Sequence, residues 1–297
     1  MPASTISGPG RLAAAYQGWM RTVLRLVLTY ALLIGLSAFI LLPLGWMLTV
    51  ALKPDHSVVF TSPPQWFPST EWNWDNFRRA ITNPDNPFGI YLINTFWLEI
   101  FVVLGTTISS ALVAYPFARL RFRGSKVLFS VVILTMLIPW QGLMVPQFLV
   151  FKTIHWYGTY LPLIVPSFTG SAFYVFLIAQ YMKSIPRELD EAARVDGASH
   201  FRIFRSVILP LSRPALTVCA VLTFLGTWND LLGPVIYLND TRQFTVAVGL
   251  ANFVSTRDPH LNMLMAANLI TMIPMLLLYF FAQRQLIGGI ASIGMKG

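Results

Sequence analysis

The sequence predicts an all-α, polytopic membrane protein with six transmembrane helices. Two features support this prediction. Of the 297 residues, 55% are hydrophobic and only 11% are charged, whereas soluble domains carry about 25% charged residues. So little charge cannot cover a water-soluble globule of this size. A bilayer accepts apolar surface when the backbone is satisfied within helices or a closed barrel, and the apolar runs here are too long for barrel strands.

Six apolar windows are long enough to cross a bilayer, which takes about 20 residues in a helix. They are residues 26–52, 91–118, 127–151, 161–182, 215–237 and 261–282. Prolines inside several windows, including Pro116, Pro139 and Pro274, remove backbone donors and predict kinks. We expect one transmembrane domain at 26–284, between a cytoplasmic N-terminal segment at 1–25 and a cytoplasmic C-terminal tail at 285–297.

The distribution of basic residues predicts the orientation of the spans. Fifteen of the 21 Lys and Arg residues lie on one side, in segments 1–25, 119–126, 183–213 and 283–297. Because cytoplasmic loops carry the excess of Lys and Arg, both termini are expected in the cytoplasm. The net charge of +9 is then a consequence of topology. Nucleic-acid binding is not expected, since the basic residues do not follow one soluble face.

Motifs for catalysis or metal binding are not found in the sequence. Cys219 is the single cysteine and lies in an apolar run, so neither a disulfide nor a thiolate metal site is expected, only packing. The four histidines lack the spacing of a metal site. No Walker loop, HExxH motif or nucleophile elbow occurs. We therefore expect no enzyme activity and no cofactor in this chain.

The basic loop at 184–213, between the fourth and fifth windows, is the most informative segment. It predicts two short helices around a glycine. Pro186 suits the first helical position, and acidic residues from Glu188 onward, including Asp190, favour the positive end of the helix dipole. Gly197 can take the left-handed conformation that ends a helix.

A second helix over 199–209 would place Phe201, Phe204 and Ile208 on one face. Pro210 and Pro214 then mark the return to the membrane.

Residue spacing alone leaves two interpretations of the first helix open. In one, the loop is a solvated amphipathic segment in which Glu191 pairs with Arg187 or Arg194, a contact worth a few tenths of a kcal/mol. In the other, the minimal side chains of Ala192 and Ala193 allow a backbone or ring of another protein to approach closely.

Several segments resemble one family of membrane proteins. Glu191-Ala192-Ala193, then Asp196-Gly197-Ala198 and Ile208-Leu209-Pro210, resemble the EAA loop of permease subunits in binding-protein-dependent ABC importers. The stretches 226–230, 244–250 and 285–297 resemble its carbohydrate branch, most of all the MalG-type subunit of maltose-type importers. The resemblance covers nearly the whole chain and is strongest after about Leu92, while residues 1–20 match nothing.

This resemblance implies a permease subunit in a prokaryotic plasma membrane that forms half of the translocation path for a carbohydrate. A disaccharide or oligosaccharide is expected, ahead of a polyol or glycerol phosphate. Its implied partners are a second permease subunit, two ATPase subunits that hold ATP and Mg, an extracellular solute-binding protein and membrane lipid. The segment 239–260 would enter the binding protein.

The residues implied to couple the chain to the ATPase are those that match the EAA loop. They are Glu188, Glu191, Ala192, Ala193, Asp196, Gly197, Leu209 and Pro210. In such importers this helix docks into a groove of the ATPase. Glu191 would orient it, the two alanines would allow close seating, and Gly197 would set the bend between the two helices.

Ionisable side chains at membrane depth are costly, so Glu99 and Asp230 need explanations. Glu99 falls early in the second window, where solvation near the interface is expected. Trp228, Asn229 and Asp230 lie in a glycine-flanked stretch and are the candidate substrate-path residues. Alternatively, Asp230 accepts hydrogen bonds from backbone groups that its own kink releases; both interpretations stay open.

Two other functional classes compete with an importer subunit. A self-sufficient secondary transporter would need its own coupling-ion site, and usually more spans or an inverted repeat. A membrane-embedded enzyme would need a catalytic pair at matching depth, and none is found. The six spans and the docking-type loop argue against the first class.

Overall fold

The structure, a computed structural model, describes residues 9–54, 63, 65–67, 71–255 and 261–294, with the side chains of 9–17, 255 and 284–294 not described. These residues are largely helical and include no strand, so the all-α class is confirmed. Four helical stretches are long and apolar enough to cross a membrane, or six if two bent pairs each count as one span. The chain divides into two compact units, residues 1–73 and 74–297.

The first unit consists mainly of α1 (Pro9–Ala51), which begins well before the expected window. Its apolar side chains are exposed along much of the helix, Phe39 at 74%, as expected of a surface that faces lipid or another subunit. Beyond its end, the Lys53 ammonium donates a hydrogen bond of 2.7 Å to the Gln65 carbonyl. The same ammonium lies 5.1 Å from the ring centre of Trp46.

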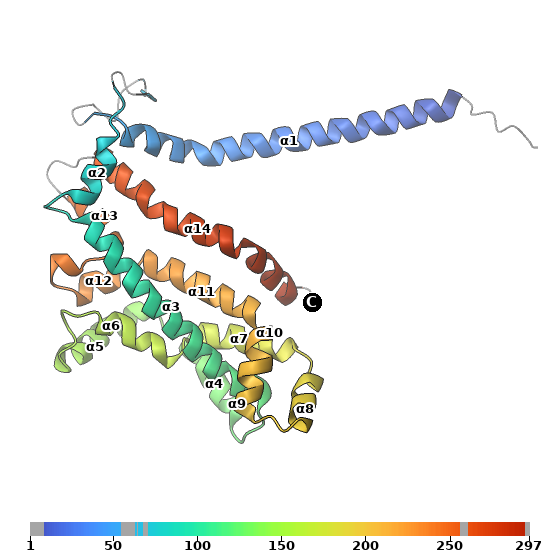
Figure 1. Ribbon diagram of the computed structural model, residues 1–297, viewed down its shortest axis with the longest axis vertical. Helices are drawn as coiled ribbons and strands as arrows, with labels where there is room; N and C mark the ends of the chain where they lie inside the picture. Colours follow the sequence, from blue (N-terminus) through green and yellow to red (C-terminus); the bar gives the residue numbers. More distant parts are fainter. Residues whose placement is uncertain (1–8, 55–62, 64, 68–70, 256–260, 295–297) are drawn as a thin grey trace, which may run out of the picture. The chain divides into compact units, whose positions relative to one another are not determined.

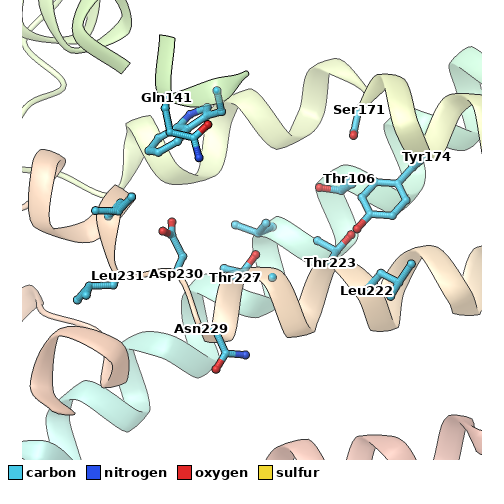
Figure 2. Close-up of a pocket in the computed structure, with 14 residues that line it drawn as sticks. Thr106, Gln141, Ser171, Tyr174, Leu222, Thr223, Thr227, Asn229, Asp230 and Leu231 are labelled. Atoms are coloured by element: carbon cyan, nitrogen blue, oxygen red, sulfur yellow. The ribbon is translucent and has the colours of Figure 1, made fainter. Parts of the chain in front are cut away.

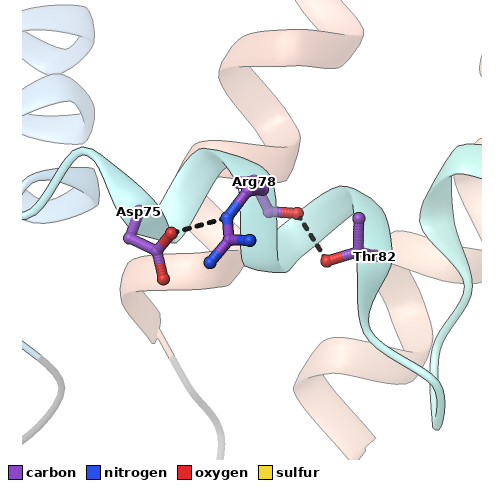
Figure 3. Close-up of polar contacts among 3 residues, drawn as sticks. All are labelled: Asp75, Arg78 and Thr82. Atoms are coloured by element: carbon purple, nitrogen blue, oxygen red, sulfur yellow. Dashed lines mark hydrogen bonds and ion pairs between the residues drawn. The ribbon is translucent and has the colours of Figure 1, made fainter.

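The second unit begins with α2 (Asp75–Thr82), a short amphipathic helix. The Arg78 Nε donates a 2.7 Å hydrogen bond to Asp75 Oδ1, and the Thr82 hydroxyl donates to the Arg78 carbonyl at 3.0 Å (Figure 3). The Arg78 guanidinium lowers the pKa of the Asp75 carboxyl below its ordinary value. Because both side chains are exposed, this pair contributes little to stability.

The body of this unit is built around α3 (Phe88–Arg119), which packs against α7 (Ala172–Ser184) and α11 (Arg213–Trp228), while α11 packs against α14 (Leu261–Gly294) (Figure 1). The α3–α7 contact is built on Ala111, Ala114 and Ala118, whose small side chains let helices approach closely. Cys219 is fully buried in the same cluster, which confirms its expected packing role.

Three of the expected windows are interrupted rather than merely kinked, and in 161–182 the interruption is a 3₁₀ turn followed by Gly170. Window 127–151 contains α4 (Ser125–Thr135) and α5 (Trp140–Thr153), which meet at 94°. Pro139 has an extended backbone there and precedes α5. Window 215–237 contains α11, a break at 229–231, and then α12 (Leu232–Tyr237). The effect of Pro139 was therefore underestimated, because the helix of window 127–151 is broken rather than kinked.

The remaining short helices lie at opposite ends of α3 (Figure 1). At its C-terminal end, α7 and α11 are joined by α8 (Glu188–Val195), α9 (His200–Ile203), the π-helical turn η2 (Phe204–Ile208) and α10 (Leu209–Leu211). Toward its N-terminal end lie α6 (Leu161–Ile164), α12, the 3₁₀ turn η3 (Thr241–Gln243) and α13 (Val246–Ser255). A second 3₁₀ turn, η1 (Val165–Thr169), joins α6 to α7.

Candidate coupling loop and translocation pocket

Helix α8 ends in a hydrogen-bonded glycine cap. Gly197 has a φ of +75°, and its amide donates to the Arg194 carbonyl at 2.9 Å while Ala198 donates to the Ala193 carbonyl at 2.9 Å. These two bonds form a Schellman motif, which satisfies carbonyls at the helix end. The predicted stop at Gly197 is confirmed. The helix is shorter than expected, because Pro186 precedes it and Glu188 is its first residue.

The second helix of the loop begins where predicted but turns a different face inward. The Ser199 hydroxyl accepts a hydrogen bond from the Arg202 amide at 3.3 Å and caps α9. Phe204 and Ile208 are buried as expected, whereas Phe201 is 64% exposed. The π-helical turn η2 changes the helical register, so Ile203 takes the inward position that the spacing assigned to Phe201.

The candidate coupling residues divide between an open face and the core. Exposed are Glu188, Glu191, Ala192, Asp196 and Gly197; half-buried are Ala193, Leu209 and Pro210. Val195, the last residue of α8, is 89% exposed. No ion pair joins Glu191 to a cation in the part of the chain that the structure describes. The solvated-loop interpretation therefore lacks the Arg187 or Arg194 contact that it invoked.

Asp190, by contrast, faces inward and meets the last residue of α3. Its Oδ2 lies 3.6 Å from Arg119 Nε, and the two side chains are only 6% and 1% exposed. One turn earlier on α3, the Tyr115 hydroxyl donates to the His200 carbonyl at 3.1 Å. Breaking a buried ion pair by removing one partner costs about 3–5 kcal/mol, because the other charge stays uncompensated.

Sequence reasoning missed this contact. Asp190 was interpreted only through the helix dipole, and Arg119 only as one of the basic residues that set the topology. The residues lie far apart in the chain, and no spacing rule links a helix end to a loop helix across that distance. The available signal was the position of an arginine directly at the end of an apolar window.

A pocket of about 650 Å³ opens between α3, α5, α7 and α11. Its wall includes Thr106 from α3, Trp140 and Gln141 from the start of α5, Tyr174 from α7 and Thr227 from α11. The Gln141 amide and the Asp230 carboxyl point into it from opposite sides (Figure 2). Asp230 is the one charged side chain among the described residues of this wall.

Asp230 reaches the pocket because the backbone is broken around it. Its Oδ1 accepts a 3.1 Å hydrogen bond from the Gly233 amide at the start of α12. A Cβ added at Gly233 would collide with the Asp230 Oδ2 atom, so this arrangement needs a glycine. Asp230 therefore accepts a hydrogen bond from a freed backbone amide and also lines the pocket, while its role in a substrate path stays a prediction.

The two residues before Asp230 lie differently from it. Asn229 is in the pocket wall, but its amide turns away (Figure 2) and donates to the Leu225 carbonyl at 2.7 Å. Trp228 is only 1% exposed and is not part of the described wall. Its ring lies 5.1 Å from Phe96 and 5.2 Å from Phe224. The structure therefore places Trp228 in an aromatic core rather than at the pocket.

The expectation for Glu99 was wrong. Rather than being solvated near the interface, it is 2% exposed within the second unit. Neither of its carboxyl oxygens has a hydrogen-bond partner among the residues that the structure describes. Helix α3 is packed on several sides, so its inward face buries this residue where hydropathy alone suggested an accessible helix end.

At the other end of α3, hydrogen bonds hold the first part of segment 239–260 against the helices of the second unit. The Asn94 amide donates to the carbonyls of Arg242 and Phe244 at 2.7 and 3.0 Å. The Tyr160 hydroxyl donates to the Gln243 carbonyl at 2.8 Å. Residues 256–260, including His260, lie outside the described residues. Entry of this segment into a binding protein stays a prediction.

Residues 106–291 match the family described as binding-protein-dependent transport system inner membrane component. This match covers more than half of the chain and includes the coupling loop and the break at Asp230. The chain belongs to this family. It is therefore a multi-pass inner membrane transport component rather than a catalytic subunit. The alternative of a self-sufficient secondary transporter finds no support in the match.

Curated relatives of this inner membrane component match it along almost their full length. The arabinooligosaccharides transport system permease AraQ of Halalkalibacterium halodurans is 30% identical over 91% of this chain and 98% of that protein. The sn-glycerol-3-phosphate permease UgpE of Pectobacterium atrosepticum is 32% identical over 88% and 94%. The maltose/maltodextrin permease MalG of Yersinia pestis is 28% identical over 92% and 94%.

Among solved structures, a chain of a bacterial ABC transporter involved in import of the acidic polysaccharide alginate has the same fold as this inner membrane component. It superposes with a TM-score of 0.77 at 21% identity, over 90% of this chain and 98% of that one. A second structure, of a bacterial alginate transporter in complex with an alginate pentasaccharide-bound periplasmic protein, gives a TM-score of 0.63 at 17% identity.

Proposed function

We propose that the chain is one permease subunit of an ATP-driven importer for a neutral disaccharide or oligosaccharide. It would act with a second permease subunit, two ATPase subunits that bind ATP and Mg, and an extracellular solute-binding protein. The family supports the dependence on a binding protein. The names of the relatives AraQ and MalG support a sugar as the transported solute.

The proposed topology has six spans and both termini in the cytoplasm. The proposed spans are α1, α3, the bent pair α4–α5, α6 with α7, α11 with α12, and α14. Of the second bent pair, residues 200–211 with 213–228, only the second helix, α11, would lie in the membrane. This arrangement places α8, α9 and α10 on the cytoplasmic side together with the basic segment at 119–126. Segment 239–260 then faces outward. The excess of Lys and Arg in the cytoplasmic segments supports this orientation.

In this proposal α8 docks into a groove of an ATPase subunit. The proposal rests on the burial of the loop residues. Asp190 and Phe204 are buried in the core, whereas the side chains of Glu191, Ala192 and Val195 are exposed. The exposed Val195 side chain is available to pack against a partner surface. Docking gives α8 different contacts in the open and closed ATPase states, as any switching mechanism requires.

The pocket beside Asp230 is proposed as this subunit's part of the sugar path. Its wall combines the Trp140 ring with side-chain hydroxyls of Thr106, Thr227 and Tyr174. Such a wall suits a polyhydroxyl solute, because an aromatic face packs on sugar carbons and the polar groups match hydroxyls. The Asp230 carboxyl would accept hydrogen bonds from sugar hydroxyls.

Glycerol phosphate is a second candidate because UgpE is among the relatives. The pocket argues against it. The charged group in the described wall is the carboxylate of Asp230, with no Lys or Arg beside it. A phosphate dianion would meet a like charge there without a compensating cation, which disfavours binding.

Transport by the reconstituted complex tests the proposal. The chain is purified with the permease, ATPase and binding protein encoded beside it, and placed in proteoliposomes with internal ATP. We expect ATP-dependent uptake of a labelled maltodextrin or arabino-oligosaccharide and no competition by glycerol 3-phosphate. Uptake without ATPase subunits, or uptake of glycerol phosphate in preference to sugars, would contradict the proposal.

A further inference from the structure

Both halves of the coupling loop are attached to the same end of α3. Arg119 meets Asp190 of α8, and Tyr115 donates to the carbonyl of His200, the first residue of α9. Tyr115 and Arg119 are four residues apart, so they share one face of α3. Gly197, which forms the bend between the two loop helices, therefore lies between two contacts with α3.

The contact between Arg119 and Asp190 is a buried ion pair. The exposed Arg78–Asp75 pair of α2 has side chains that are 74% and 45% exposed, whereas this one is almost fully buried. No nitrogen of the Arg119 guanidinium has a hydrogen-bond partner in the part of the chain that the structure describes. Asp190 is thus the counter-charge of Arg119, and at 3.6 Å the pair lies just beyond hydrogen-bond distance.

The pocket lies farther toward the N-terminus of α3 than this ion pair. Val102 and Thr106 of α3 line it, and α3 is a single helix from Phe88 to Arg119. A displacement of α8 that is carried through Asp190 would therefore reach the wall of the pocket along α3, which stays one helix through Pro116. In the proposed mechanism a second route leads through Leu209 and Pro210 into α11, which supplies another part of the wall.

We propose that the Asp190–Arg119 ion pair is the joint through which α8 moves α3, so that ATPase closure reshapes the pocket from two sides. This inference rests on the proposed function and adds a positioning residue, Arg119, that lies outside the EAA loop. Arg119 holds α8 to the wall of the pocket without touching either the sugar or the ATPase.

This role of the Asp190–Arg119 ion pair can be tested in proteoliposomes that contain the complete importer. The quantity to measure is the ratio of sugar transported to ATP hydrolysed. Asp190→Asn keeps the shape of the side chain and removes its charge. We expect it to retain ATPase activity stimulated by the binding protein, but to lower the ratio at least about fivefold, the lower end of usual coupling factors. An Asp190→Asn importer with the wild-type ratio would overturn the proposal.

If Asp190→Asn does not assemble, the double variant Arg119→Met/Asp190→Leu replaces it. Apolar pairs often substitute for buried ion pairs without loss of stability, so this variant should assemble with the ATPase. Its ratio should still fall, because an apolar contact can slide where an ion pair holds. Assembly with an unchanged ratio would show that the contact is only structural.

Arg123→Gln is the control for loss of a charge near this end of α3, since it removes the positive charge of an exposed arginine just beyond the helix. It should leave the ratio unchanged, and a fall as large as that of Asp190→Asn would refute the joint. The wild-type importer separates the two proposals. If it shows no ATP-driven uptake, the proposed function fails; if it couples normally and the variants couple equally well, only the joint fails.

Discussion

Replacement of Gly197 by alanine isolates the backbone geometry of the coupling loop. Gly197 has a φ of +75°, and nothing lies within 4 Å of the Cβ that alanine would add. The change therefore introduces no collision within the chain. Its effect comes from the left-handed conformation, which costs an L-residue roughly 1–2 kcal/mol. A cost of that size lowers the population of the closed Schellman motif about 5- to 30-fold.

We expect Gly197→Ala to reduce the amount of sugar transported per ATP, while Gly197→Asn retains most of it because asparagine tolerates the left-handed region. Gly124 provides the control. It has a φ of +83° with nothing within 4 Å of an added Cβ, and it precedes α4 rather than lying in the coupling loop. Gly124→Ala should lower thermal stability to a similar extent and leave the ratio unchanged.

The assay is uptake and ATP hydrolysis in the same proteoliposome preparation, with thermal unfolding in detergent alongside. The reasoning is refuted if Gly197→Ala is destabilised like Gly124→Ala but transports with the wild-type ratio. It is equally refuted if both variants lower the ratio by the same factor, because the effect would then reflect general destabilisation.

Three further changes have expected outcomes. Gly233→Ala should displace the Asp230 carboxyl, lower stability by about 1–3 kcal/mol and slow sugar uptake; normal uptake would argue against Asp230 in the path. Glu99→Gln should raise the unfolding temperature, because it removes a buried carboxyl without a partner among the described residues; a clear fall would indicate an essential charge. Gly105→Ala would place a Cβ 2.5 Å from Ser167 Oγ and should lower the unfolding temperature, an outcome that unchanged melting would contradict.

The features that the sequence predicted correctly are local ones. The helical class follows from the length of the apolar windows, and the end of α8 follows from the conformational freedom of Gly197. The buried packing of Cys219 follows from its apolar neighbours and lack of a partner. Each of these depends on residues close together in the chain.

The features that could not be predicted from the sequence depend on residues that are far apart in the chain. Hydropathy does not distinguish the lipid-facing from the inward face of a packed helix, so Glu99 was expected in solvent. A proline predicts a lost hydrogen bond, but whether its helix bends slightly or breaks by 94°, as after α4, depends on neighbouring helices. The same holds for Asp190 and Arg119, whose contact exists only once α8 folds back onto α3.

The central claim is that α8 meets an ATPase subunit in the cytoplasm. Because Cys219 is the single cysteine of the chain, a Cys219→Ser background allows one reactive site to be introduced, and Val195→Cys puts it on the open face of α8. With a maleimide that carries a photoreactive benzophenone on inside-out vesicles, we predict a cross-link between Val195→Cys and the ATPase, because the benzophenone inserts into nearby C–H bonds after the maleimide has reacted with the thiol. We predict none from Asn239→Cys. Labelling of Val195→Cys by an impermeant reagent from outside intact cells, with no link to the ATPase, would contradict the account.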